Sequence, residues 1–178
     1  MKFPLYHNVP SDMKGDTLYP LNVLKETHPD LYKKYVKKYE DRMKVMEQKV
    51  PFFDCLWNDV IHLSAIHPKY LKEALKEIGI EFSGKYFIID AVDLDADKLV
   101  VWLNSVDDRN TNKDEKYFEF FNPEHYEGIY SVFPKERQMK AWKEYVEHHG
   151  GNPLLWIRCP HVLYKGGISL KGTQIIEV

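Results

Sequence analysis

The chain has 178 residues, of which 44% are hydrophobic and 29% are charged, and its formal net charge at pH 7 is −2. This composition is typical of a globular protein and argues against an intrinsically disordered chain. The small negative charge argues against a dedicated binder of duplex nucleic acid, which needs a basic surface, but it leaves a small nucleotide or a single base as a ligand.

The N-terminal part of the chain predicts a strand, a turn-rich loop and a long helix. Residues 3–7 have the apolar character of a short strand, and the loop after them is rich in turn-forming residues. Thr27 with Asp30 three residues later resembles a capping box, and Pro29 suits the first turn of a helix. We therefore expect a helix over about 28–48, with apolar residues at helical spacing opposite a lysine-rich face.

The middle of the chain predicts buried strands around a second helix. A strand over 59–64 leads into a helix over 68–78, and Gly79 ends this helix. Continuous apolar runs over 86–92 and 99–103 predict two strands in the middle of a sheet. The acidic turn between these strands lacks the glycine and the closing glutamate of an EF-hand loop, so we expect a solvated hairpin and no calcium site.

The C-terminal part predicts a polar loop, a third helix and several strands. The polar stretch 104–116 predicts an exposed, mobile loop that could act as a lid. A helix over 134–149 ends at Gly150. Further strands are expected over 117–121, 154–158, 161–165 and 173–178. We therefore predict an α+β fold in which 1–178 form a single domain with about three helices.

Cysteine content and the N-terminal sequence indicate the compartment. Cys55 and Cys159 form neither a disulfide framework nor a CxxC pair. Cys55 stands among apolar residues, so we expect a buried, inert thiol. The first residues contain no apolar stretch of signal-peptide length, and no apolar run is long enough for a membrane span. We therefore expect a cytoplasmic protein without a membrane partner.

The common catalytic motifs are absent. The sequence contains no GxGxxG, GxxxxGK[ST], HExxH or GxSxG, which removes the commonest nucleotide-binding, zinc-protease and serine-hydrolase interpretations. The eight histidines include no close pair at a spacing that places two metal ligands on one helical face. We therefore predict no metal site.

Polar side chains inside apolar segments are the remaining candidates for a site. His7 ends the first strand, His62 and Ser64 share one face of the second strand, and His161 opens a late strand. Tyr70 lies at the start of the helix that follows Ser64. Each residue alone is more often a hydrogen-bonded core residue. Together they indicate a site, because a buried imidazole is costly unless it has a partner or a function.

Three segments resemble the ADP-ribosyltransferase-like superfamily. Residues 60–79, VIHLSAIHPKYLKEALKEIG, are similar to the His-Leu-Ser strand and following helix of RNA 2'-phosphotransferases. Residues 5–7, LYH, resemble the first strand whose histidine holds the NAD ribose in poly(ADP-ribose) polymerases and phosphotransferases. Residues 161–168, HVLYKGGI, resemble the Glu-Val-Leu…Gly-x-Ile ending of many members, including DNA-modifying toxins.

This resemblance implies a split, mostly antiparallel β core with a cleft between its halves and with NAD or another nucleotide as ligand. It implies that Tyr70 stacks on nicotinamide and that His7 contacts the ribose. The residues implied to bind the cofactor are Tyr6, His7, His62, Ser64 and Tyr70, and the residues implied to be catalytic are His7 and His161.

The residue at the catalytic-acid position departs from the family pattern. Most active transferases have a glutamate where this chain has His161, and that glutamate stabilises the oxocarbenium-like transition state. A histidine can act as a base or orient an acceptor, but it cannot supply the same negative charge. Glu124 and Glu177 stay open as substitutes.

Two functions therefore stay open. The first is an NAD- or nucleotide-using transferase whose acceptor is a protein, a nucleic acid or a free metabolite. The second is a non-catalytic module of the same architecture that binds a nucleotide or a partner protein. The missing glutamate favours the second function. The aromatic content of 14% suits either a base-stacking pocket or a partner surface.

Overall fold

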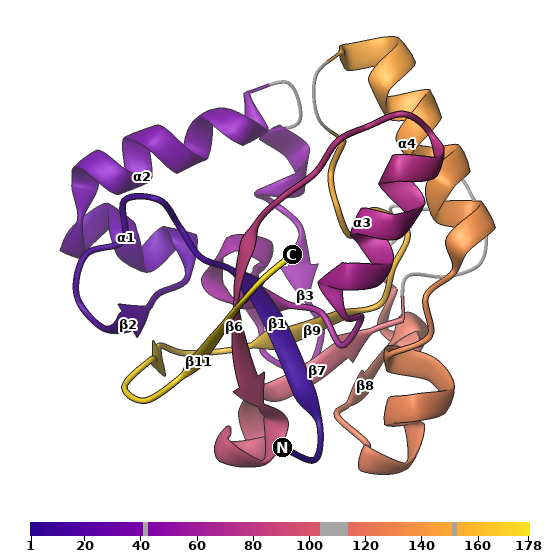
Figure 1. The fold of residues 1–178 in the computed structure, drawn as a ribbon. Coiled ribbons are helices and arrows are strands. Elements are labelled where there is room, and N and C mark those ends of the chain that lie inside the picture. The colour runs from indigo at the N-terminus through magenta and orange to yellow at the C-terminus, as the bar shows by residue number, and fades with distance from the viewer. Residues whose placement is uncertain (41–42, 104–113, 151–152) are drawn as a thin grey trace.

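The computed structural model describes residues 1–40, 43–103, 114–150 and 153–178 (Figure 1). Its α-helices are α1 (Leu21–Thr27), α2 (Pro29–Val36), α3 (Pro68–Glu77) and α4 (Lys135–His149). Shorter helical turns include η1 (Lys37–Tyr39), η3 (Trp57–Asp59), η4 (Ala91–Asp93), η7 (Pro123–His125) and the π-helical turn η8 (Tyr126–Tyr130). The N-terminal strands are β1 (Pro4–Asn8), β2 (Thr17–Leu18), β3 (Lys49–Val50), β4 (Cys55–Leu56) and β5 (Ile61–Leu63). The remaining strands are β6 (Lys85–Asp90), β7 (Leu99–Trp102), β8 (Phe118–Phe120), β9 (His161–Tyr164), β10 (Ile168–Ser169) and β11 (Gln174–Glu177).

The strands form several small antiparallel sheets, which confirms the predicted α+β class with a split β core. The two larger sheets have the strand orders β1-β6-β11 and β5-β9-β7-β8, and the short pairs are β10-β2 and β3-β4. Both β6 and β7 are interior strands, as their continuous apolar runs predict. Figure 1 shows β1, β6 and β11 crossing in front of β9 and β7.

The main core lies between the two larger sheets. Leu5 and Ile89 of the three-stranded sheet belong to one buried cluster with Leu63, Val101 and Val162 of the four-stranded sheet. At one corner the sheets join through a bridge, in which the Tyr6 N–H donates to the Ser64 carbonyl (2.7 Å) and the Ser64 N–H donates to the Tyr6 carbonyl (3.1 Å). The bridge therefore links β1 to the end of β5, two of the segments on which the family resemblance depends.

Two further clusters cover the outer faces of the sheets. Helices α3 and α4 pack through buried Leu71, Leu75 and Trp142, together with the segment around Cys159. The region from β3 to η3 packs on the four-stranded sheet through a third cluster that includes Trp57 and Leu163. Among the described residues, no helix combines the length and the apolar character that a membrane crossing requires.

The predicted helix over 28–48 begins as expected, because α2 starts at Pro29, but the predicted length is wrong: α2 ends at Val36 and η1 covers Lys37–Tyr39. Helix α1, which precedes His28, has no counterpart among the predicted elements. Pro29 lacks an N–H and disfavours a helical residue before it, so His28 has φ −146° and ψ 72° and separates the two helices. The Thr27 hydroxyl donates to the Val23 carbonyl (3.0 Å) inside α1, so the predicted capping box does not form.

The predicted strand over 154–158 is also absent, because side chains of α4 bind its backbone. The Gln138 side-chain amide donates to the Leu155 carbonyl (2.6 Å), and the Trp142 indole N–H donates to the Leu154 carbonyl (3.1 Å). The Cys159 thiol donates to the side-chain oxygen of Gln138 (3.2 Å), which gives a third contact between this part of the chain and α4. This segment therefore packs on a helix and joins no sheet.

Three smaller expectations need correction or lie outside the description. The acidic turn after β6 joins no hairpin, because β6 and β7 belong to different sheets. Cys55 is half-buried and Cys159 is the fully buried thiol, although burial raises the pKa of both. Residues 104–113 of the predicted lid lie outside the described residues.

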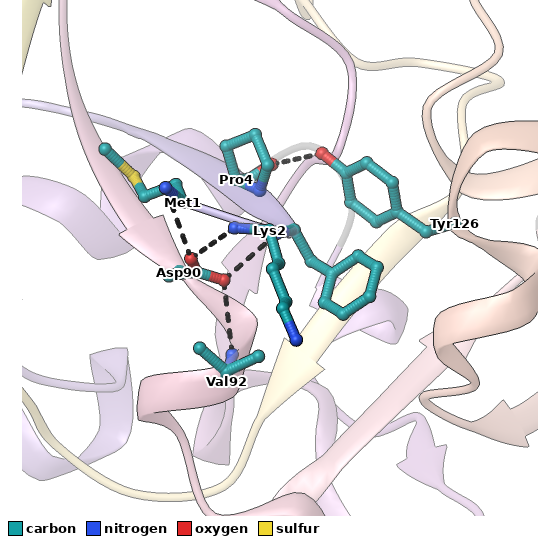
Figure 2. Close-up of polar contacts among 7 residues, drawn as sticks. Met1, Lys2, Pro4, Asp90, Val92 and Tyr126 are labelled. Atoms are coloured by element: carbon teal, nitrogen blue, oxygen red, sulfur yellow. Dashed lines mark hydrogen bonds and ion pairs between the residues drawn. The ribbon is translucent and has the colours of Figure 1, made fainter.

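Asp90, at the end of β6, fixes the N-terminus of the chain (Figure 2). Its carboxylate accepts from the backbone N–H groups of Lys2 (2.6 Å), Phe3 (3.1 Å) and Val92 (3.4 Å), and it lies 4.0 Å from the N-terminal ammonium. Burial raises the pKa of the Asp90 carboxyl, but the three backbone hydrogen bonds outweigh burial, so the net shift of its pKa is downward.

We expect Asp90→Asn to lower the free energy of unfolding by about 1–3 kcal/mol at pH 7, because an amide replaces a buried, hydrogen-bonded carboxylate. A depressed pKa in the folded state gives stability that is present above the unfolded pKa and is lost as pH falls through the folded pKa. The difference between wild type and variant should therefore shrink below about pH 4. Urea denaturation across this pH range measures it, with Asp93→Asn on the exposed turn η4 as control. A difference that is the same at pH 7 and at pH 3 would contradict the assignment.

Candidate functional site

Four aromatic side chains form a continuous row beside the bridge between the sheets. We call Tyr6, His67, Tyr70 and Phe133 the aromatic row. The ring centroids of Tyr6 and His67 are 4.9 Å apart, and those of His67 and Tyr70 are 6.3 Å apart. The rings of Tyr70 and Phe133 lie nearly parallel, with an interplanar angle of 13° and centroids 6.4 Å apart. The row therefore connects β1, the start of α3 and the segment before α4.

The turn between β5 and α3 sets the position of Tyr70. The buried Ser64 hydroxyl accepts from the Ile66 N–H (3.1 Å), which tightens the chain directly after the bridge. The His67 ring then caps α3, since its Nδ1 accepts from the Lys69 N–H (3.1 Å). Tyr70 follows in the first helical turn and stays 47% exposed. Ser64 is thus a positioning residue, and Tyr70 presents an open ring.

Two members of the row, Tyr6 and His67, are uncharged at neutral pH. Burial raises the pKa of Tyr6, and Tyr70 raises it further. Burial lowers the pKa of His67, and the charge of Lys69 lowers it further. Both side chains therefore stay neutral near pH 7. The row is a series of polarisable rings in which only Tyr70 and Phe133 lie nearly parallel.

His62 and His161 meet in a second group, which we call the histidine–tryptophan cluster together with Trp57 and Trp102. His161 pairs with Trp102 across β9 and β7, and their rings stack with centroids 5.4 Å apart. The His62 and His161 ring centroids are 6.1 Å apart, and His62 Nε2 lies 2.9 Å from the Trp57 carbonyl. Both tryptophans are 7% exposed, so the cluster is packed and not an open cleft.

His7 lies apart from the histidine–tryptophan cluster. It pairs with Phe87 across β1 and β6 and shares the face of β1 that carries Leu5. Burial and the charge of Lys38 together lower the pKa of His7 to about 4, although the hydrogen bond to the Asn8 carbonyl acts in the opposite direction. Nδ1 of the neutral ring donates to the Asn8 carbonyl (2.6 Å), which leaves Nε2 as an acceptor.

The structure does not bring the two predicted catalytic residues together. His161 lies on the face of β9 that carries Leu163, in contact with the outer cluster, whereas His7 lies on the face of β1 that points to the core between the sheets. Tyr6, Ser64 and Tyr70 do come together around His67. The cofactor and catalytic roles of all these residues stay predictions.

A carboxylate–histidine–tyrosine cluster is the feature that the sequence did not reveal. Glu119 of β8 lies 2.8 Å from Nδ1 of His125 and also accepts from the Tyr130 hydroxyl. The alternation Phe118-Glu119-Phe120 predicts that Glu119 faces away from its neighbours, but no spacing rule predicts which residues lie opposite. The π-helical turn η8, which positions Tyr130, has no sequence signal that could have been used.

A small pocket lies between the loop before β2 and the first two helices. Its lining includes Met13, Tyr19, Leu24, His28 and Tyr35, and its volume is about 40 Å³. This volume holds a few water molecules at most, so the pocket does not accommodate a nucleotide. In the described parts of the chain, no three His, Cys, Asp or Glu residues are grouped so that they could hold a metal ion.

Comparison of the chain with protein-family models, curated proteins and solved structures finds no match.

Proposed function

We propose that this chain binds a nucleotide, with NAD as the expected ligand, and that the flat ring of the base or nicotinamide stacks on Tyr70. The observation that carries the proposal is the 47% exposed ring of Tyr70 in the aromatic row, held nearly parallel to Phe133. This is the second of the two functions that the sequence leaves open, a binding module of ADP-ribosyltransferase-like architecture.

The physical properties of the row suit a planar ligand. Stacking of a base on an aromatic side chain contributes about 1–3 kcal/mol. The contacts with His67 and Phe133 already order Tyr70, so binding loses little side-chain entropy. The start of α3 and the exposed Lys69 lie next to the ring, and both favour the negative charge of phosphate groups.

Tyr70→Ala should weaken nucleotide binding about 5- to 150-fold, which corresponds to the loss of one stacking contact. Thermal unfolding with NAD, ADP-ribose and ATP detects binding, because a ligand at 100 times its Kd stabilises the folded state by about 2.7 kcal/mol. The matched control is Phe52→Ala, which removes a ring that is 45% exposed and lies outside the aromatic row. Equal affinities for the Tyr70 and Phe52 variants would refute the proposal.

A transferase is the second candidate, and the bridge between Tyr6 and Ser64 favours it. This bridge joins β1 and β5, two of the three segments that resemble the family, as one nucleotide site would need. The aromatic row is suited to bind NAD. His161 departs from the family pattern, and its ring stacks on Trp102. Nicotinamide release from NAD separates the candidates, since binding without release favours the module. The acceptor would be a protein, a nucleic acid or a free metabolite.

A further inference from the structure

An exposed aromatic pair lies at the edge of the four-stranded sheet. The ring centroids of Phe52 and Phe120 are 5.1 Å apart, and the two residues are 45% and 50% exposed. Phe120 lies on the edge strand β8, and Phe52 lies in the loop that joins β3 to β4. Among the described residues, neither ring belongs to a buried cluster. The pair therefore adds little to the core and presents apolar surface to solvent.

The backbone of Phe52 adopts a conformation that disfavours a large side chain. Its φ is +68°, in the left-handed region that glycine adopts readily and bulky residues adopt rarely. The next residue, Phe53, anchors the loop in a buried cluster, whereas the Phe52 ring packs against the exposed Phe120 ring. Strained positions of this kind occur mostly at functional sites. The loop would form more easily with glycine at this position, so the aromatic ring serves a purpose other than folding.

The backbone of Phe120 is open on the side of β8 that faces away from β7. The Phe121 N–H donates to the Leu99 carbonyl (3.0 Å). The Leu103 N–H donates to the Tyr117 carbonyl (2.9 Å). Since alternate residues of an antiparallel pair face the neighbouring strand, the N–H and carbonyl groups of Phe120 point away from β7. No residue that the structure describes forms a hydrogen bond with either group. The two groups match the backbone of an added extended chain.

The segment around β8 is acidic. Residues 114–127 contain five aspartate and glutamate residues, and Lys116 is the one lysine or arginine among them. Glu119 lies on the opposite face of β8 from Phe120, and its side chain is 28% exposed. A chain laid along β8 therefore meets aromatic rings on one face and a carboxylate on the other. Positive charge on that chain complements the charge of the segment.

We propose that the edge of β8 binds an extended, basic segment of a partner protein by strand addition, with the rings of Phe52 and Phe120 as its apolar contact. One partner residue lies opposite Phe120 and exchanges backbone hydrogen bonds with it. Its side chain lies on the same face as the Phe120 ring, so it is apolar. The residues on either side of it point to the face that carries Glu119, where lysine or arginine fits. This surface lies outside the aromatic row, so the proposal goes beyond nucleotide binding.

The peptide acetyl-KVKFKVK-amide, which we call the lysine peptide, is the probe. In an extended conformation its apolar side chains share one face and its lysines share the other. In ¹H–¹⁵N spectra of the full chain, the lysine peptide should shift the amide signal of Phe120 and leave that of Tyr70 in place, with a Kd of about 1 mM or lower. A Phe120 signal that does not move at this concentration would overturn the proposal.

Two matched peptides separate the contributions of charge and backbone. In acetyl-EVEFEVE-amide the apolar face is kept and the charge is reversed, so binding should be at least ~10-fold weaker. An N-methyl group on the phenylalanine of the lysine peptide removes the donor to the Phe120 carbonyl and should weaken binding by about 10-fold. If either matched peptide binds as well as the lysine peptide, strand addition of a basic segment is wrong.

Variants of the chain distinguish this surface from the aromatic row. Phe120→Ala should weaken binding of the lysine peptide by about 10-fold or more and leave the Kd for NAD unchanged. Tyr70→Ala should weaken NAD binding and leave the peptide Kd unchanged. If only Tyr70→Ala weakens the peptide, the peptide binds at the aromatic row and the present proposal fails. The proposed function is judged by NAD binding alone, so the two failures are distinguishable.

Phe52→Gly tests whether the strained position serves binding. Glycine adopts a φ near +68° without strain, so the melting temperature of this variant should not fall. Its affinity for the lysine peptide should nevertheless fall by about 10-fold, because one of the two rings is lost. A lower melting temperature with unchanged peptide affinity would assign the Phe52 ring to the fold and contradict its role in binding.

Discussion

Trp142→Ala should lower the free energy of unfolding by about 3–5 kcal/mol, the range for removal of a large buried aromatic side chain. Trp142 is 0% exposed and fills the cluster between α3 and α4. Its indole N–H also donates to the Leu154 carbonyl (3.1 Å), which would keep only the Ile157 N–H (3.2 Å) as a donor. The ring of Trp142 supports Phe133 as well, at a centroid distance of 6.4 Å. The variant should therefore also loosen the last member of the aromatic row.

Urea denaturation monitored by circular dichroism measures this effect. Lys143→Ala is the matched control, because it changes the next residue of α4 on the exposed side. The control should change the free energy of unfolding by less than about 0.5 kcal/mol. A Trp142→Ala variant as stable as this control would show that α4 does not pack as described.

Leu163→Ala should lower the free energy of unfolding by about 2–5 kcal/mol, because it opens a cavity in a strand with neighbours on both sides. Leu163 of β9 is 0% exposed and lies between His62 of β5 and Val100 of β7. It packs in the same cluster as Trp57. The cavity should therefore change the tryptophan fluorescence of the histidine–tryptophan cluster before the protein unfolds.

Ile175→Ala is the control for Leu163. Ile175 lies on the edge strand β11 and is 53% exposed, so its truncation should change the free energy of unfolding by less than about 0.5 kcal/mol. Denaturation followed by fluorescence compares the two variants directly. Similar losses of stability in both would contradict the assignment of β9 to the interior of the sheet.

The sequence predicts the fold class and the interior strands β6 and β7, because those signals are local. The apolar runs of β6 and β7 are continuous, and both strands are interior. Gly79 adopts φ +78° directly after α3, as a helix-ending glycine should. The backbone conformation required at these positions follows from neighbours within a few residues.

The errors arise where tertiary contacts or competing local signals decide the structure. Thr27 and Asp30 match the capping-box pattern, yet the conformation that Pro29 imposes on His28 separates α1 from α2. Residues 154–158 have the apolar character of a strand, but Gln138 and Trp142 bind two of their carbonyl groups. The hydrophobic pattern predicts neither the backbone conformation of His28 nor the hydrogen bonds from α4.

The candidate site was predicted in part, for the same physical reason. The order of Ser64 and Tyr70 along the chain indicates a strand that leads into a helix, and the structure places both residues beside Tyr6. Glu119 and His125 meet only because η7 and η8 turn the chain back onto β8. A contact made by such a turn has no periodic signal in the sequence.

The most direct test of the central claim is an intermolecular nuclear Overhauser measurement between bound NAD and the aromatic protons of the protein. If the base or nicotinamide stacks on Tyr70, cross-peaks should connect its ring protons to Tyr70 and Phe133, whose rings lie 6.4 Å apart. Cross-peaks only to aromatic residues outside the aromatic row, such as Phe52 or Phe120, would place the ligand elsewhere and contradict the account.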